Sequence, residues 1–309
     1  MKLLTMKFTK IFFISILACL LAACELNINP DLENADRVLV VNGWITNRPG
    51  NQTIVLTKTQ PYFEKSLPPT VAGATVTVSD DKGGVFNFSE DPTKKGNYVW
   101  KPTANELFGT IGNSYKLSIQ SEGEIFESFA KMGRVPGIDS ITLKKNDPDK
   151  LNPDFYIAQQ WATDIPGKGD FYWVRAVKNG QRLNKPAEIN IAADAGFAPE
   201  STIDGITFLP NVREGISPFD KDANGTALSP YLPGDSVYVE IHSITLAAFN
   251  HLQQVSIQTN RPGGFAELFA TPLSNVSSNI RNVNPSGKKV VGFFNVAAVS
   301  GLGKRFPKK

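Results

Sequence analysis

The chain contains only two histidines, His242 and His251, so chemistry that depends on an imidazole base or metal ligand has few starting points. His242 follows Glu240 by two residues, and alternate residues of a strand share one face at a spacing of about 7 Å. A histidine–carboxylate dyad is conceivable there, although a solvent-facing sheet surface is the simpler interpretation. His251 lies beside the apolar face of a predicted helix, which favours a packed or boundary residue.

Oxygen ligands at alternate positions occur in the segment DKDANG, where Asp220, Asp222 and Asn224 precede Gly225. This spacing matches the first half of a calcium loop, in which the glycine allows a sharp turn. The twelfth position is Tyr231 rather than glutamate, so the bidentate ligand is missing. We therefore expect a polar turn, keep the three oxygen-bearing residues as a secondary metal candidate, and expect no cofactor.

The sequence lacks the nucleophile elbow, the phosphate-binding loop and the paired histidine and cysteine motifs of common enzymes. A hydrolase can work with two carboxylates alone, and 29 acidic residues make a chance pair inevitable. Because nothing favours such a pair, we expect a protein without catalysis.

Four tryptophans could stack on sugar rings, but each lies in or beside an apolar strand segment, which favours the core. Among them Trp100 borders a loop, so the core interpretation is weakest for this residue. The four are Trp44, Trp100, Trp161 and Trp173.

The first 23 residues have the pattern of a signal peptide: three lysines, no acidic residue, and then an apolar run over residues 11–23. That run is shorter than the about 20 residues that cross a membrane. The segment Leu21–Cys24 resembles the lipobox of bacterial lipoproteins, in which the cysteine sulfur takes a diacylglycerol and becomes the first mature residue. Ordinary cleavage near Ala23 and an uncleaved anchor are the alternatives, and Cys19 would leave an apolar stub on the mature chain.

Cleavage before Cys24 would leave the mature chain with one acylated cysteine, so its stability must come from a packed core rather than a disulfide. The chain has 32 basic and 29 acidic residues, and the three signal lysines account for the difference. A nucleic-acid partner would need a clustered basic stripe, which the neutral mature chain does not carry. The basic residues at its C-terminus are simply explained as a solvated end.

Residues 24–309 exceed the usual size of one compact domain, so two are expected. Alternation in ATVTVSDD, where Val76 and Val78 alternate with Thr75 and Thr77, is typical of a strand with one buried face. Turn residues follow at hairpin positions. The sequence predicts an all-β fold. It divides into a signal peptide (1–23), a lipidated tether (24–36), an N-terminal immunoglobulin-like or transthyretin-like sandwich (37–134) and a second β-rich domain with one helix (135–309).

Three elements of the second domain are predicted. A strand over residues 235–245 leads directly into a helix over residues 246–258, with Ser243 or Thr245 as its N-cap. The apolar segment of residues 288–300 predicts a strand in the middle of a sheet. The long stretch of residues 184–233 is rich in Pro, Gly, Asp and Asn, which predicts extended loops that are either functional or partly disordered. These loops are the candidate surface for contact with a partner.

The lipobox, together with LVVNGWI, TKTQPYF, LPGDSVYVEIHSIT, NVSSNI and VVGFFNVAAVS, resembles an uncharacterised lipoprotein family of Bacteroidetes, catalogued as domain of unknown function forty-two forty-nine. The resemblance spans essentially the whole mature chain. Because its genes commonly lie beside those for TonB-dependent outer-membrane transporters, it implies an accessory role in uptake, with no catalytic or binding residues to carry over.

We therefore expect an outer-membrane lipoprotein, anchored through Cys24, that serves as an interaction or substrate-capture subunit of TonB-dependent nutrient uptake. Its partners would be the membrane and a transporter. A structural adhesin or envelope scaffold and a secreted carboxylate-dependent hydrolase are the alternatives. The ligand and the side of the outer membrane stay open.

Overall fold

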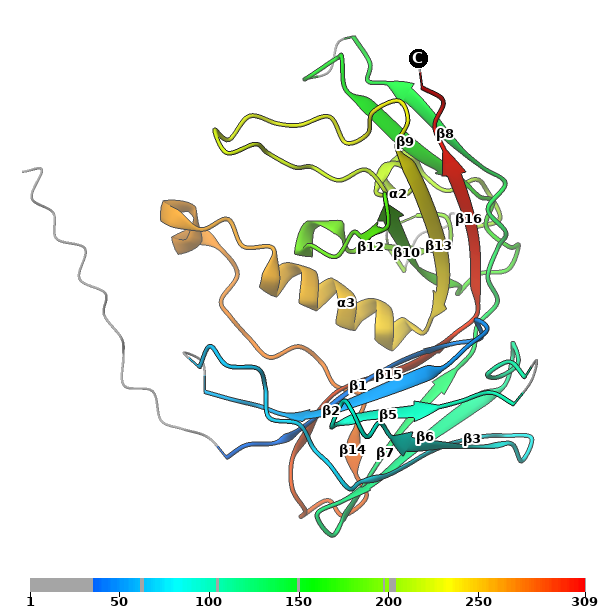
Figure 1. Cartoon of the computed structure of the whole chain (residues 1–309), viewed down its shortest axis with the longest axis vertical. Coiled ribbons are helices and arrows are strands. Elements are labelled where there is room, and N and C mark those ends of the chain that lie inside the picture. The colour runs from blue at the N-terminus through cyan, green and yellow to red at the C-terminus, as the bar shows by residue number, and fades with distance from the viewer. Residues whose placement is uncertain are drawn as a thin grey trace, which may run out of the picture. The chain divides into compact units, whose positions relative to one another are not determined.

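The computed structural model describes residues 36–61, 64–103, 106–148, 151–196, 198–199 and 204–308. Residues 37 onward form one compact unit, in which strands far outnumber helices (Figure 1). The all-β prediction is confirmed. Within the described residues, no helix has the length and apolar character needed to cross a bilayer.

The first sheet has nine strands in the order β14-β7-β6-β3-β4-β5-β2-β1-β15. Its two ends come together, since β7 packs against β15, and the strands enclose a sandwich-like core. The strands are β1 (Leu39–Thr46), β2 (Gln52–Lys58), β3 (Thr75–Asp80), β4 (Val85–Glu90), β5 (Asn97–Trp100), β6 (Ser114–Ser121), β7 (Glu124–Lys131), β14 (Arg281–Asn282) and β15 (Val290–Ala297).

Alternation of side chains positions this first core as the sequence predicts. Val76 and Val78 of β3 are buried, and their polar neighbours turn away from the core. Tyr98 is fully buried, and its hydroxyl donates to the Val71 carbonyl and accepts from the Ala74 amide, both at 2.9 Å. The buried phenol is therefore satisfied and ties the loop before β3 to the sheet.

The second sheet has the order β11-β10-β13-β16, with β12 also paired to β10, and a separate hairpin joins β8 to β9. Valines and isoleucines of β10 and β13 form its core together with Tyr172, Tyr231 and Phe306. The strands are β8 (Ser140–Lys145), β9 (Tyr156–Trp161), β10 (Phe171–Lys178), β11 (Gln181–Arg182), β12 (Asn190–Ala193), β13 (Ser236–Ile244) and β16 (Val299–Arg305).

The predicted helix is confirmed as α3 (Leu246–Thr259), and Thr245 is its N-cap, accepting from the Ala248 amide at 3.2 Å. It packs on β10 and β12 and shares a third core with Phe293 of β15, between the two sheets (Figure 1). The short elements are α2 (Pro210–Glu214) and the 3₁₀ helices η1 (Pro186–Glu188) and η2 (Gly264–Phe269).

The C-terminal segment belongs to both sheets. β15 pairs in parallel with β1, and after Ala298 the chain continues as β16 beside β13. The prediction of a central strand is wrong, because β15 ends the first sheet; its later residues are buried because cores lie on both of its faces. The boundary near residue 134 stays a prediction, and β14 and β15 join the first sheet from beyond it.

Within the described residues, the segment of residues 184–233 is largely irregular, as expected, but parts of it pack into the second core instead of extending freely. β12 pairs with β10, and Phe208, Val212 and Ile216 contribute to the second core. Tyr231 is fully buried and donates its hydroxyl to the Ile216 carbonyl at 2.7 Å.

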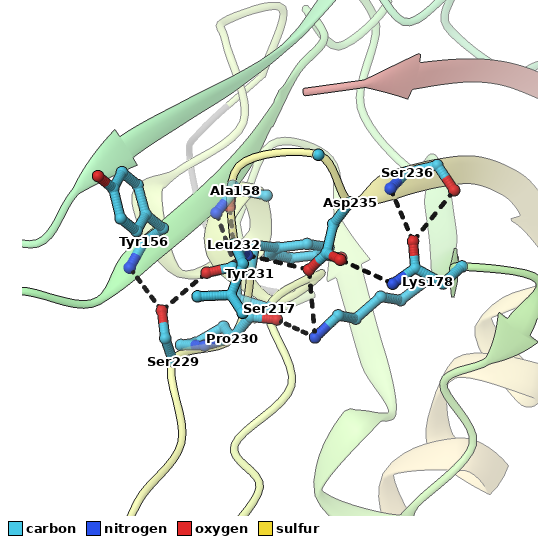
Figure 2. A network of polar contacts seen from close by, with 12 residues as sticks. Tyr156, Ala158, Lys178, Ser217, Ser229, Pro230, Tyr231, Leu232, Asp235 and Ser236 are labelled. Carbon is cyan, nitrogen blue, oxygen red and sulfur yellow. Dashed lines mark hydrogen bonds and ion pairs between the residues drawn. The ribbon is translucent and has the colours of Figure 1, made fainter. Parts of the chain in front are cut away.

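Around Tyr231 a polar network anchors the same segment to the sheets (Figure 2). The Ser229 hydroxyl accepts from the Tyr156 amide at 2.9 Å, and Lys178 Nζ donates to the Pro230 carbonyl at 2.6 Å. In this segment, which is rich in Pro, Gly, Asp and Asn, individual hydrogen bonds rather than the regular pairing of a sheet hold the backbone in place.

Candidate functional site

A small recess lies between the two sheets. Its cavity volume is about 20 Å³, enough for a water-sized group. We call it the inter-sheet recess. It is lined by Trp44, Ile45, Thr46, Trp173, Arg175, His242, Ile244, Asn295 and Ala297.

Strand alternation brings these side chains to one place. On β10 and β13 every second residue, such as Val174 and Ile241, packs into the second core. The residues between them point to the opposite face of the sheet. That opposite face carries Trp173, Arg175 and His242, and it packs against the outer face of β1 and β15. The recess is the space that remains where the two sheets meet.

Aromatic rings form one wall of the recess. The rings of Trp44 and Trp173 meet edge to face with centroids 5.2 Å apart, and Trp44 stacks on Phe293 at 5.5 Å. His251 of α3 lies 4.4 Å from the Phe293 ring, and its Nδ1 is 2.6 Å from the Ser277 carbonyl oxygen. The prediction that His251 is a packed boundary residue is confirmed.

Glu240 and His242 form a buried pair, with His242 Nε2 2.8 Å from Glu240 Oε2. Their exposed fractions are 3% and 5%, so the expectation of a solvent-facing surface is wrong. The sheet face is covered by β1, β15 and the loop after β1, which brings Arg48 into an ion pair with Glu240. The carboxylate is thus compensated by one cation and one imidazole N–H.

The charges around His242 keep it neutral. Burial lowers the pKa of His242 to about 3, and the positive charges of Arg175, Arg182 and Arg48 act in the same direction. At neutral pH the ring therefore donates from Nε2 to Glu240 and carries no charge.

Arg175 is the charged group of the recess lining. Its guanidinium lies 4.2 Å from the centre of the Trp173 ring, a cation–π contact. Burial, followed by the charge of Arg182, lowers the pKa of Arg175 to about 10. Among the described residues it has neither an ion pair nor a hydrogen bond, so its donors are free to meet a ligand.

A second feature lies at the C-terminal end of α3 and in the segment that follows it. Four large apolar side chains are exposed there, with exposed fractions from 48% to 78%. Phe265 and Phe269 contact each other at 5.5 Å, and Phe269 and Ile257 line an open groove of about 460 Å³. We call this surface the helix-end patch; its residues are Ile257, Phe265, Phe269 and Leu273.

The segment of the calcium candidate forms a polar turn. Asp222 Oδ1 accepts from the amides of Asn224 and Thr226 at 2.9 and 2.8 Å, and Asp220 pairs with Lys185. The carboxylates are therefore directed at protein groups rather than at a common point.

Three other carboxylates do converge, with ligand atoms within 4.8 Å of one another: Asp164, Asp194 and Asp204. Burial raises the pKa of Asp164, whose oxygens accept from the Tyr172 hydroxyl at 2.7 Å and the Gly205 amide at 3.1 Å. Backbone amides likewise donate to Asp194 and Asp204. Oxygen ligands suit a hard cation, but these carboxylates already act as turn-forming acceptors.

The tryptophans behave largely as core residues. Trp100 is buried against Phe86 and Phe108, so the core interpretation is confirmed for the tryptophan that borders a loop. Trp161 is half-buried; its indole N–H donates to Thr142 at 2.9 Å, and Arg213 stacks on its ring at 3.9 Å.

The lipidation candidate Cys24 lies outside the described residues, and its assignment stays a prediction. Sequence reasoning missed both Arg175 and the three converging aspartates. The position of Arg175 could have been predicted, because buried and less buried residues alternate along the strand FYWVRAVK. This alternation places Arg175 on the same face as Trp173. The aspartates come from three separate loops and carry no common spacing.

No curated protein matches this chain. A family model described as "Domain of unknown function (DUF4249)" matches residues 25–301, which is most of the chain and includes every strand of the inter-sheet recess. The chain therefore belongs to the family that is defined by this domain of unknown function.

Proposed function

We propose that this protein is a lipid-anchored outer-membrane lipoprotein that acts without catalysis, as an interaction or substrate-capture subunit beside a TonB-dependent transporter. The observation that carries the proposal is the helix-end patch. Phe265 and Phe269 are more than three-quarters exposed and contact each other, and Phe269 lines the groove. Contiguous exposed aromatic surface of this kind is typical of binding sites.

The chemistry of the patch favours a protein partner with an apolar segment. Aromatic side chains are enriched where interfaces bury their central contacts, and a groove of about 460 Å³ has room for one or two inserted side chains. Arg261 also lines the groove and is already paired with Glu267, so the surface offers little unbalanced charge. Recognition would therefore depend on local packing rather than on long-range attraction.

The proposed anchor supplies proximity to such a partner. Twelve residues separate Cys24 from Arg37, and an extended chain spans at most about 3.5 Å per residue, or roughly 40 Å. Attachment at Cys24 would keep the folded body within that reach of the membrane surface. A transporter in the same membrane then meets the body at a high effective concentration.

The test is recovery of a transporter with the full-length lipoprotein after mild crosslinking in native membranes. We expect a TonB-dependent transporter with the wild type, and at least about tenfold less with the double variant Phe265→Ser/Phe269→Ser, since buried aromatic anchors dominate interface energies. Val85→Ser/Ile111→Ser changes two exposed apolar residues, one at the start of β4 and one in the loop before β6. It is the matched control and should recover as much as the wild type.

The outcomes separate the alternatives. Recovery of no transporter by the wild type would contradict the uptake proposal and favour the envelope scaffold. Equal recovery by both double variants would remove the patch from the proposal. Loss of binding to protein-free liposomes in the Phe265/Phe269 variant, with transporter recovery unchanged, would assign the patch to lipid.

A further inference from the structure

The inter-sheet recess combines a cation without a partner with a cavity beside it. Arg175 lines the cavity, and in the described part of the chain its guanidinium contacts the Trp173 ring but no carboxylate. Arg175 is half-buried, so its charge is only partly solvated, and a partly buried cation of this kind is stabilised further when an anion binds it. The Arg175 guanidinium therefore has no anionic partner among the described residues.

Two further arginines add positive charge near the recess. Arg48, Arg175 and Arg182 all act on His242, and Glu240 is the carboxylate that faces them. Glu240 lies opposite Arg175 in the β10–β13 ladder, but it is bound by Arg48 and His242 and, among the described residues, forms no ion pair with Arg175. Since His242 is neutral, the pocket keeps an excess of positive charge.

The size of the recess limits what can enter. About 20 Å³ accepts a single small group, which suits one monatomic anion or one oxygen atom of a carboxylate. The polar atoms of Asn295 are already engaged, because its Oδ1 accepts from the Thr245 amide at 3.2 Å. Arg175 is thus the donor available to an incoming anion.

We propose that the inter-sheet recess is a binding site for a small monovalent anion, held by Arg175 beside the contacting rings of Trp44 and Trp173. The anion is either a free halide or the carboxylate of a larger ligand. This site is separate from the helix-end patch and does not depend on the proposed function. The guanidinium group of arginine can bind both kinds of anion. Because Trp44 and Trp173 line the recess, binding can be followed by their fluorescence.

Iodide is a suitable probe because it is a monatomic anion that quenches tryptophan fluorescence on contact. The full-length lipoprotein in detergent is titrated with sodium iodide, and sodium sulfate keeps the ionic strength constant. We expect a saturable quenching component from Trp44 and Trp173 on top of linear collisional quenching. Arg175→Gln should weaken the saturable component at least about tenfold, because a charge-assisted contact is lost.

Arg213→Gln is the matched control, since Arg213 stacks on Trp161 in the same way but lies outside the recess. It should keep the saturable component. If Arg175→Gln fails to fold by circular dichroism, Arg175→Lys replaces it: the charge remains but the fork is lost, and the iodide affinity should fall several-fold.

Competition identifies the source of the anion. Displacement of iodide by acetate and by an N-acetyl amino acid would assign the recess to the carboxylate of a larger ligand, whereas displacement by chloride alone would assign it to a free halide. Strictly linear quenching of the wild type, or a saturable component that Arg175→Gln and Arg175→Lys leave unchanged, would overturn the proposal.

Discussion

Glu240 is a buried carboxylate whose charge is balanced by groups from distant parts of the chain. Arg48 lies 192 residues before it and pairs with Oε1, and His242 lies next to Oε2. Removal of one partner of such a group leaves an uncompensated charge, which is far more costly than the net gain from the pair. The residue that controls the pH response of this cluster is His242.

His242 makes the folded protein sensitive to mild acid. Its folded pKa of about 3 lies below its unfolded value of 6.5, so the unfolded chain takes up a proton first and stability falls as pH drops from about 6.5 towards 3. Between pH 6 and 5 we expect this group to cost about 1.4 kcal/mol per pH unit. Urea unfolding of the wild type and of His242→Gln should show a shallower loss in the variant.

His251→Gln is the companion variant, because it removes the other histidine and leaves the buried pair intact. Its loss of stability with acid should stay close to that of the wild type. Parallel pH profiles for the wild type and His242→Gln would contradict the buried, neutral state of His242.

For single residues, the sequence predicts which face of a strand a side chain lies on, but not whether that face is covered by other parts of the chain. Strand alternation correctly placed Glu240 and His242 on one face, within reach of each other. It could not show that β1, β15 and Arg48 cover that face, since these groups are remote in the chain. Arg175 could be placed on the same face by the same rule, but its lack of a partner depends on the whole neighbourhood.

The pairing of β1 with β15 depends on a glycine at their closest approach. Gly292 has a φ of +118°, and a Cβ atom there would lie 2.0 Å from the Val41 carbonyl oxygen. A side chain at this position has no room and the backbone conformation disfavours one. The parallel ladder that joins the C-terminal segment to the first sheet therefore requires glycine at 292.

Gly292→Ala should lower the free energy of unfolding by at least about 2–3 kcal/mol, since it combines backbone strain with a clash against main-chain atoms. Gly137→Ala is the control: a Cβ there meets nothing within 4 Å and the φ is not positive. Urea denaturation measures both. A Gly292→Ala protein as stable as Gly137→Ala would show that the β1–β15 register is wrong.

Elements with local signals were predicted well from the sequence. The α3 helix has an N-cap and apolar residues at helical spacing, and the strands of the first sheet alternate, so neighbouring residues determine both. The edge position of β15 and the packing of residues 184–233 depend on partners far along the chain. Irregular composition predicted loops there, whereas Tyr231 and its network hold the segment in the second core.

At the scale of the whole molecule, the C-terminal strands hold the two sheets together. β15 completes the first sheet, β16 completes the second, and the Ser243 hydroxyl accepts from the Ala298 amide at 2.8 Å where the chain crosses between them. The body can thus act as one unit that presents the helix-end patch. What places that unit at a membrane, in our proposal, is the lipid on Cys24.

The central claim, that this body works as a lipid-anchored protein, is tested most directly by metabolic labelling with a clickable palmitate analogue. We predict label on the wild type and on Cys19→Ala, and none on Cys24→Ala, because in our proposal residues 21–24 direct acylation to Cys24, and a chain cleaved before Cys24 has no other thiol. The body of Cys24→Ala should still unfold cooperatively, since the described core does not include this residue. Label that persists on Cys24→Ala, or a wild type that takes up none, would contradict the account.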